Sequence, residues 1–268
     1  MHAALRTPLQ VFSPEDKFSL FWNLITPILV VYDTFFTPFQ VAFFMDERDN
    51  TFLNVSAVIS PIFFALDILI NFRMAFYNKG VLITDGREIV KHYLREGFMS
   101  DFLTVITDIL SIACIDTSLW FLKVVSIIRL KKLWAIITRS EDFLIMSRIW
   151  NALLKMLKLW GTIIIVAHWL ACCLYTVAYM ELREGYTYTW IHVNKLVDSP
   201  TYERYVAVFY WSITTMVTVG YGDLVPVTVA ERIYTVIAMI ISSALFGYSL
   251  NTVGEIIREM NREKDQRR

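Results

Sequence analysis

TTMVTVGYGD, residues 214–223, is the stretch that decides the fold of this chain. It closes a short apolar segment, Tyr205–Val219, which does not reach the length of about 20 apolar residues that a bilayer-spanning helix needs. Gly220 and Gly222 then allow backbone conformations that other residues rarely adopt. Irregular backbone at membrane depth is tolerated only where it is buried in protein or lines a water-filled path. We therefore predict a re-entrant helix and loop, and we place the functional site in this loop.

The chemistry expected of this loop is the coordination of a dehydrated cation. Consecutive backbone carbonyl oxygens that face one axis can replace the water around a potassium ion, and glycines supply the backbone angles that such an arrangement needs. One chain provides only one wall, so the prediction is a homotetramer with K⁺ as the permeant ion and with no cofactor or other metal. The predicted selectivity filter consists of Thr218, Val219, Gly220, Tyr221 and Gly222, with Asp223 at the outer mouth.

Two details complete this prediction. Tyr221 is expected to brace the loop against Tyr210 and Trp211 of the preceding short helix, and the charge of Asp223 is expected to raise the local cation concentration. The competing interpretation of the glycines is a simple turn that caps a helix, which does not account for the whole ten-residue string.

Composition places the chain among integral membrane proteins. Hydrophobic residues make up 56% of the 268 residues and charged residues 19%, whereas soluble domains average about 25% charged residues. The net charge is zero, so no overall field favours nucleic acid as a partner. The three cysteines, Cys114, Cys172 and Cys173, all lie in apolar runs and are predicted to be free and to bind no metal. Met1–Pro8 is too short and too polar for a signal peptide, so the first apolar run is expected to be a retained helix.

Six apolar runs are candidate membrane spans, which predicts an all-α membrane protein. They are Phe18–Met45, Phe52–Tyr77, Phe98–Ile115, Leu119–Thr138, Leu157–Met180 and Ile233–Ile257. The predicted organisation is a cytoplasmic N-terminal segment (1–17), a voltage-sensor-like domain of four helices (18–140), a pore domain of two helices with the re-entrant helix and filter (141–257) and the start of a cytoplasmic linker (258–268).

The distribution of lysine and arginine predicts the orientation. Basic residues gather between the second and third spans, between the fourth and fifth, and in the tail, and they are fewer in the other connections. Both termini are therefore expected in the cytoplasm, and the membrane is expected to be the plasma or ciliary membrane. The charged tail stops abruptly, which suggests that the native chain is longer.

The string at 214–223 resembles the signature of potassium channels with six segments and a re-entrant pore loop. Tyr202–Asn251 resembles the pore and last helix of the branch that includes ether-à-go-go, plant inward-rectifier and cyclic-nucleotide-gated channels. His168–Cys172 resembles the fifth segment of that branch, Asp67–Arg73 the end of its second and Phe98–Asp101 the start of its third. In that family a cyclic-nucleotide-binding-like domain follows the sixth helix. The resemblance thus implies control by a C-terminal domain that is absent from this chain, and a cyclic nucleotide as partner only through that domain.

The fourth span carries cations in the spacing of a weak voltage sensor. Counting by three gives Lys123, Arg129 and Lys132, with uncharged residues at other positions of the stripe. A charge that crosses the membrane field is worth about 2.3 kcal/mol per 100 mV, so a few charges could still bias opening. The alternative is that these cations are anchors that snorkel to the inner membrane edge.

Acidic residues inside the first three spans are the expected countercharges. Asp67 and Asp101 match acidic positions of the family, and they are the predicted partners of Arg129 and Lys132. For Asp33 and Asp108 two interpretations stay open: interior residues of the bundle, or solvated residues near the membrane surfaces.

The predicted gate lies on the sixth span. Gly247 is either a hinge or a site of close helix packing, because glycine in a helix interior is about 1 kcal/mol less favourable than alanine. Leu250, Val253 and Ile257 recur at helical spacing and would form an apolar constriction in four copies. His168 is predicted to be a hydrogen-bonded packing residue.

Two further classes compete with a potassium-selective channel: a poorly selective cation channel, and a non-conducting subunit that modulates other channels. Nothing in the sequence favours an enzyme, because the carboxylates are better explained as countercharges.

Overall fold

The computed structural model describes residues 11–44, 51–78, 80–113, 125, 128–129 and 148–266. The chain forms two compact units, one of Met1–Thr37 with Glu47–Thr138 and one of Pro38–Asp46 with Arg139–Arg268. The division falls at Pro38, inside a long helix, where the proline ring removes a backbone N–H from the helical ladder. The predicted sensor-like domain, 18–140, differs from the first unit in three ranges: the unit also contains residues 1–17, and it lacks residues 38–46 and 139–140.

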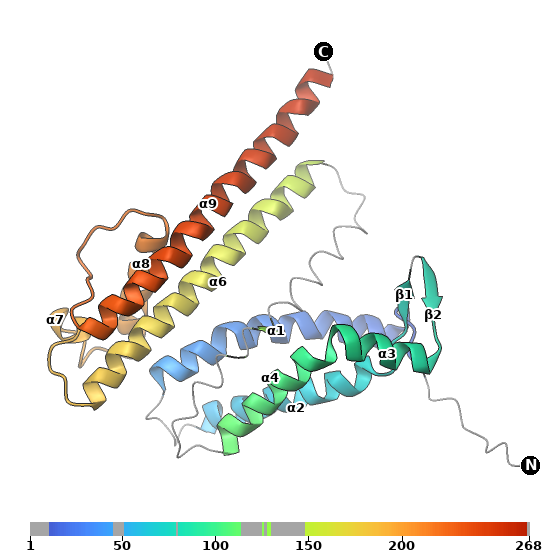
Figure 1. Ribbon diagram of the computed structural model, residues 1–268, viewed down its shortest axis with the longest axis horizontal. Helices are drawn as coiled ribbons and strands as arrows, with labels where there is room; N and C mark the ends of the chain where they lie inside the picture. The colour runs from blue at the N-terminus through green and yellow to red at the C-terminus, as the bar shows by residue number, and fades with distance from the viewer. Residues whose placement is uncertain are drawn as a thin grey trace, which may run out of the picture. The chain divides into compact units, whose positions relative to one another are not determined.

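The first unit contains most of the N-terminal helix, two further long helices, a short helix and a β-hairpin (Figure 1). Its elements are α1 (Lys17–Phe43, whose last residues belong to the second unit), α2 (Thr51–Asn71), β1 (Phe76–Asn78), β2 (Val81–Ile83), α3 (Gly86–Glu96) and α4 (Phe98–Ala113). α2 packs against α4, and a small apolar core of Val30, Phe64, Ile68 and Val105 lies between the helices. The first three predicted spans therefore correspond to α1, α2 and α4.

Two elements of this unit were not predicted. Phe76–Asn78 pairs antiparallel with Val81–Ile83 around a tight turn that contains Gly80 at a φ of +83°. α3 follows directly, and Asp85 caps it by accepting a hydrogen bond from the backbone N–H of Arg87 at 3.0 Å. The connection between the second and third spans is thus folded against α4.

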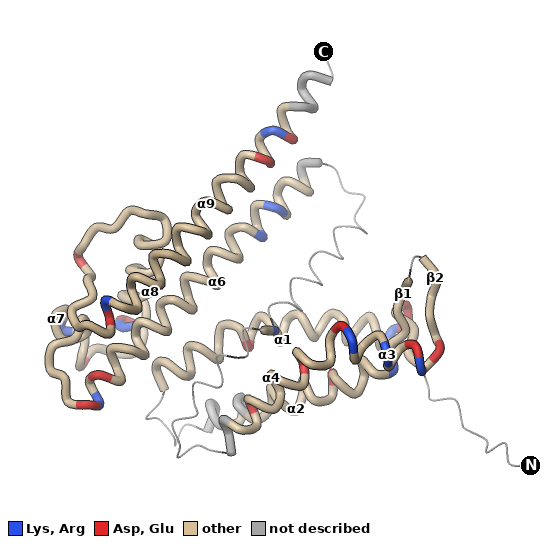
Figure 2. The backbone as a smooth tube through the Cα atoms, viewed as in Figure 1, with Lys and Arg blue, Asp and Glu red and all other residues tan. Residues whose placement is uncertain are grey.

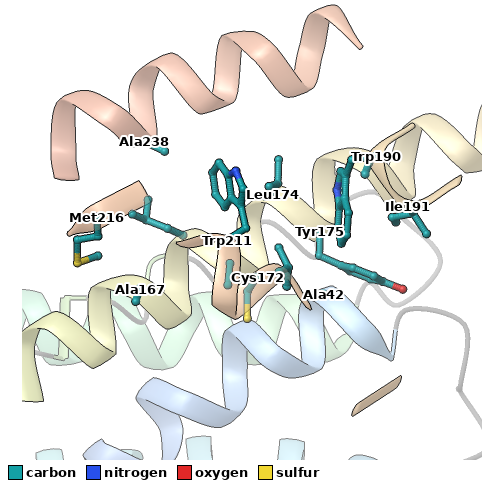
Figure 3. Packing of buried hydrophobic residues seen from close by; sticks show 14 residues of the cluster. Ala42, Ala167, Cys172, Leu174, Tyr175, Trp190, Ile191, Trp211, Met216 and Ala238 are labelled. Carbon is teal, nitrogen blue, oxygen red and sulfur yellow. The ribbon is translucent and has the colours of Figure 1, made fainter. Parts of the chain in front are cut away.

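The second unit is built on two long helices. Its elements are α6 (Arg148–Arg183), α7 (Trp190–Val193), α8 (Thr201–Met216) and α9 (Val229–Gln266). α6 packs against both α8 and α9. The core between them is apolar and aromatic, with Tyr175 and Leu174 from α6 meeting Trp211 from α8 and Trp190 from α7 (Figure 3). α8 is the predicted re-entrant helix, since its 16 residues span only about 24 Å at 1.5 Å per residue.

Among the described residues, three helices are long and apolar enough to cross a bilayer: Lys17–Phe43, Trp150–Arg183 and Val229–Asn261. The predicted fourth span, Leu119–Thr138, lies outside the described residues except for Val125, Ile128 and Arg129. Those three residues adopt 3₁₀ geometry, in which side chains three positions apart are aligned along the helix.

Candidate functional site

The loop after α8 has an unusual backbone. The N–H groups of Val219 and Gly220 both donate to the carbonyl oxygen of Thr214, at 2.9 and 3.2 Å, and so turn the chain back over the end of α8. φ is positive at Thr218 (+60°), Gly220 (+55°) and Gly222 (+77°), and it is not positive at the two residues between them. Positive φ at every second residue departs from an extended strand, in which all residues have negative φ. The backbone from Thr218 to Gly222 is therefore neither a strand nor a helix.

Thr218 is the notable member of this alternation. It is a β-branched residue at positive φ, where a side chain at Cβ crowds the backbone by roughly 1–2 kcal/mol. Apart from Thr218 only Lys195, among the described non-glycine residues, has a positive φ. A residue held at a sparsely populated φ within a loop is a reason to test that position for a function.

Aromatic residues hold the outer part of the loop. The rings of Tyr221 and Tyr210 are stacked, with centroids 6.4 Å apart and planes 4° apart. The Tyr210 hydroxyl donates to one carboxylate oxygen of Asp223 at 2.9 Å, and the Leu224 N–H donates to the other at 3.0 Å. α8 thus contributes the predicted brace through Tyr210, whereas Trp211 is buried in the core cluster of the unit.

The loop covers almost nothing of its own chain. Val219 is 49% exposed and Tyr221 72% exposed, and all residues from Val217 to Asp223 are exposed. No atom of the described structure lies within 4 Å of a Cβ built at Gly220 or Gly222. At these two positions the positive φ, rather than space, demands glycine.

α9 presents much apolar surface to the outside. A stripe of small and polar side chains faces the rest of the unit and is buried: Glu231, Thr235, Ala238 and Ser242. Many large apolar side chains on the remaining surface are exposed, from Val229 to Met260. An exposed apolar surface of this extent is expected to face lipid or other protein chains.

The predicted gate residues lie along this helix. α9 continues through Gly247, and no described atom lies within 4 Å of a Cβ built there, so packing within its own chain does not explain this glycine. Leu250 and Ile257 are exposed, and Val253 is half-buried.

Glu231, which sequence reasoning missed, joins the start of α9 to the neighbouring loop. Its side chain is fully buried at 0% exposure, and its carboxylate accepts N–H bonds from Val227 (2.7 Å), Thr228 (3.1 Å) and Trp190 (3.1 Å). The Thr228 hydroxyl accepts from the Glu231 N–H at 3.1 Å and donates to Glu181 at 2.6 Å. This is a capping box, and the signal that could have found it is the spacing Thr228-x-x-Glu231 before an apolar run.

In the first unit, Arg129 is buried between two acidic residues. It is 4% exposed, and it pairs through one terminal nitrogen with Asp33 of α1 and through the other with Asp108 of α4. Its guanidinium carbon also lies 4.0 Å from the centre of the Phe64 ring, which favours a cation. Asp33 and Asp108 are themselves buried, so the interpretation of them as solvated surface residues is wrong.

The carboxylates predicted for Arg129 have other contacts. Asp67 accepts from the indole N–H of Trp22 at 2.8 Å and from the Asn71 amide at 3.1 Å. Asp101 accepts from the Tyr93 hydroxyl at 2.8 Å, and burial, followed by this carboxylate, raises the pKa of Tyr93 above its ordinary value. Arg129 therefore pairs with Asp33 and Asp108 instead of Asp67 or Asp101, and the predicted pairing of these two with Lys132 stays a prediction. Lys123 and Lys132 lie outside the described residues.

His168 of α6 is hydrogen-bonded, as predicted for a packing residue. Its Nδ1 lies 2.9 Å from the Tyr205 hydroxyl, and the side chain is buried. Across the described part of the chain, no group of three or more His, Cys, Asp or Glu side chains is arranged to hold a metal ion.

The long apolar helices and the glycine loop behind a short helix define an all-α integral membrane protein. The sequence matches the ion transport protein family over residues 19–266, nearly its whole length, and the chain belongs to that family.

Three proteins of similar sequence are named as potassium channels. The chain is 28% identical to potassium channel AKT1 of Arabidopsis thaliana over 92% of its own length and 28% of the relative. It is 27% identical to the potassium voltage-gated channel unc-103 of Caenorhabditis elegans, over 91% of the chain and 32% of the relative. It is 26% identical to the potassium voltage-gated channel protein eag of Drosophila melanogaster, over 96% of the chain and 23% of the relative. The chain spans about a third or less of the length of these three relatives.

Proposed function

We propose that this protein is the subunit of a tetrameric, potassium-selective channel that conducts K⁺ passively through a filter formed by residues 218–222. The observation that carries the proposal is the alternating backbone at Thr218, Gly220 and Gly222 in a loop that is fully exposed on one chain. Four such loops around one axis would offer rings of carbonyl oxygens in place of water. The names of the relatives and the membership of the ion transport family support the same ion and the same role.

The proposal assigns roles to the residues around the filter. Tyr210 holds Tyr221 and Asp223 from behind, and Asp223 adds negative charge at the outer mouth. The exposed apolar surface of α9 would be covered partly by neighbouring subunits and partly by lipid, with Leu250, Val253 and Ile257 toward the closed end of the pore. No chemical step is involved, so this is a channel rather than an enzyme.

The test is a flux and reversal-potential measurement on the full chain reconstituted in liposomes. In opposing gradients of Na⁺ and K⁺, a potassium-selective filter should bring the reversal potential close to the potassium equilibrium potential. A reversal potential near zero would replace the proposal with a poorly selective cation channel. Silence from correctly assembled tetramers would favour a non-conducting modulatory subunit.

We propose further that the fourth segment senses voltage weakly through Arg129, with Lys123 and Lys132 as the other charges of the stripe. Arg129 and its two buried carboxylates support this role, because a buried cation with exchangeable side-chain partners can move in a field. Three further points stay predictions: both termini lie in the cytoplasm, the protein resides in the plasma or ciliary membrane, and a cyclic-nucleotide-binding-like domain controls it. A protease-protection assay on a tagged terminus tests the predicted orientation.

A further inference from the structure

The outer face of α3 is a defined surface that the proposed pore does not use. The inner face of this helix is fixed, because Ile89 is 1% exposed and the Tyr93 hydroxyl donates to Asp101 of α4 at 2.8 Å. The Tyr93 ring also meets the Phe72 ring edge-on at 4.9 Å. Contacts on one side and the Asp85 cap at the start hold α3 in one rotation about its axis, so its opposite face always points outward.

The outward face combines cations with apolar side chains. Its members recur at i, i+3, i+4, i+7 and i+8, the spacing of one side of a helix, and all are exposed. They are Arg87, Val90, Lys91, Leu94 and Arg95. At 100° per residue, the three cations form the middle of the face and the two apolar residues one flank of it.

The acidic residues of α3 do not lie beside the two apolar residues of this face. Glu88 and Glu96 fall on the flank away from Val90 and Leu94, and Glu96 pairs with His92 at 3.4 Å. His92 is in turn stacked on the Phe76 ring of the hairpin at 3.8 Å. In Figure 2 the blue (Lys, Arg) and red (Asp, Glu) segments of the backbone lie close together around α3, β1 and β2.

A helix with basic residues beside apolar ones is suited to the surface of a bilayer that carries anionic lipids. Its apolar residues enter the boundary of the acyl chains, while Lys and Arg reach the headgroups with their long stems. Gly97 alone separates the C-terminal end of α3 from α4, an apolar helix of 16 residues that corresponds to the third predicted span, so α3 ends beside a predicted entry into the bilayer. A protein partner is less suited, because a stable interface buries about 800 Å² on each side and α3 is only 11 residues long.

We propose that the outward face of α3 is a binding site for anionic phospholipid headgroups, with Arg87, Lys91 and Arg95 contacting the headgroups and Val90 and Leu94 the acyl chains. Positively charged cytoplasmic connections also set the orientation of membrane proteins. Setting the orientation requires only the number of cations in a connection. It explains neither why the three cations share one face of α3 nor why two exposed apolar residues lie beside them.

The experiment places a reporter on this face of the full chain. The native cysteines are replaced by alanine, Leu94 by cysteine, and the new thiol is labelled with bimane. The protein is reconstituted in mixed phosphatidylcholine and phosphatidylglycerol vesicles in which one lipid or the other carries brominated chains. Since each cation near an anionic surface contributes about a fivefold preference, brominated phosphatidylglycerol should quench the label several-fold more strongly than brominated phosphatidylcholine at equal mole fraction.

Variants and salt separate lipid binding from a role in orientation. The triple variant R87Q/K91Q/R95Q should lose the preference, while the charge-conserving R87K/R95K should keep it. A matched triple, R183Q/K195Q/R232Q, removes the same charge from exposed positions of the second unit and should leave the preference unchanged. In the labelled chain with all three cations intact, raising the salt from 0.1 to 1 M should weaken the preference, because the screening length falls from about 10 to about 3 Å.

Equal quenching by the two brominated lipids in the labelled chain with the three cations intact would overturn the proposal, as would a preference that persists in R87Q/K91Q/R95Q or is insensitive to salt. These readouts do not depend on conduction. A chain that is silent in the flux assay but retains the lipid preference would contradict the proposed channel and leave this inference intact.

Discussion

The two units bury charge in opposite ways. In the first unit, Arg129 is neutralised by the side chains of Asp33 and Asp108, which come from two different helices. In the second, Glu231 is neutralised by three backbone N–H groups, two of them at the start of its own helix. Backbone donors are fixed by the fold, whereas side-chain partners can be exchanged when one helix slides past another. The comparison teaches that the buried charge of the second unit is held by backbone groups next to the start of α9. The buried charge of the first unit depends instead on side chains from α1 and α4.

The largest effect is expected in the glycine loop after α8, in the second unit. Gly220→Ala adds a methyl group where no atom is close but φ is +55°, so it strains only the backbone. We expect a near-complete loss of potassium flux in liposomes, with membrane insertion and yield unchanged. Gly185→Ala, at another glycine with positive φ (+92°), is the matched control and should conduct normally. Unaltered selectivity and flux in Gly220→Ala would contradict the filter assignment.

The next effect tests the exchangeable charge of the first unit. Arg129→Gln leaves two buried carboxylates without their cation, and breaking a buried ion pair typically destabilises a protein by about 3–5 kcal/mol. We expect a lower unfolding midpoint and a flatter conductance–voltage curve, since each charge contributes about 2.3 kcal/mol per 100 mV. Arg129→Lys keeps the charge and should preserve the slope of the curve better than it preserves stability. A conductance–voltage curve identical to that of the native chain would mark the fourth segment as vestigial.

Glu231 tests the fixed charge of the second unit. Glu231→Ala removes the acceptor of the buried N–H of Trp190 and of the partly buried N–H groups of Val227 and Thr228, and an unsatisfied buried group destabilises the fold by roughly 1–3 kcal/mol. We expect a loss of thermal stability of the reconstituted protein together with faster loss of conduction during sustained opening. Glu231→Gln keeps one acceptor oxygen and should fall between the alanine variant and the native chain. If both variants retain native stability, the buried carboxylate does not stabilise the segment before α9.

The smallest effect concerns the brace behind the loop. Tyr210→Phe keeps the ring stacked on Tyr221 but removes the exposed hydrogen bond to Asp223. We expect retained potassium selectivity with a measurably shorter open time in single-channel records. Tyr202→Phe, which removes an exposed hydroxyl at the start of α8, is the control and should behave as the native chain. A record for Tyr210→Phe that matches this control would show that the bond to Asp223 is dispensable.

The helices were largely predictable from the sequence, because a bilayer imposes a minimum length on each apolar run. α1, α2 and α4 begin within about one residue of the predicted spans, and α8 and the glycine loop lie where the apolar pattern placed them. α6 extends nine residues before the predicted start at Leu157, because Arg148–Met156 is amphipathic rather than uniformly apolar. α3 escaped prediction for the same reason: hydropathy averages out its two faces, and only the Asp85 cap with Ile89 and Tyr93 at i and i+4 signals it.

Pairings between distant residues were the part that the sequence could not supply. Asp33 lies 96 positions and Asp108 lies 21 positions from Arg129, and four carboxylates of similar surroundings were available for it. Which of them reaches the guanidinium depends on how α1, α2 and α4 are rotated about their axes. By contrast, the irregular backbone of the loop was predictable, because it depends on consecutive residues and Gly220 and Gly222 favour positive φ.

The exposure of residues 217–223 in a single chain has a practical consequence for mutational screens. Because the segment is exposed, we expect most substitutions in it to leave the folding of the chain nearly unchanged. Libraries ranked by yield, surface display or melting temperature will therefore score damaging changes there as silent. Only a selection for ion uptake, such as growth of a transport-deficient host on limiting potassium, will reveal them.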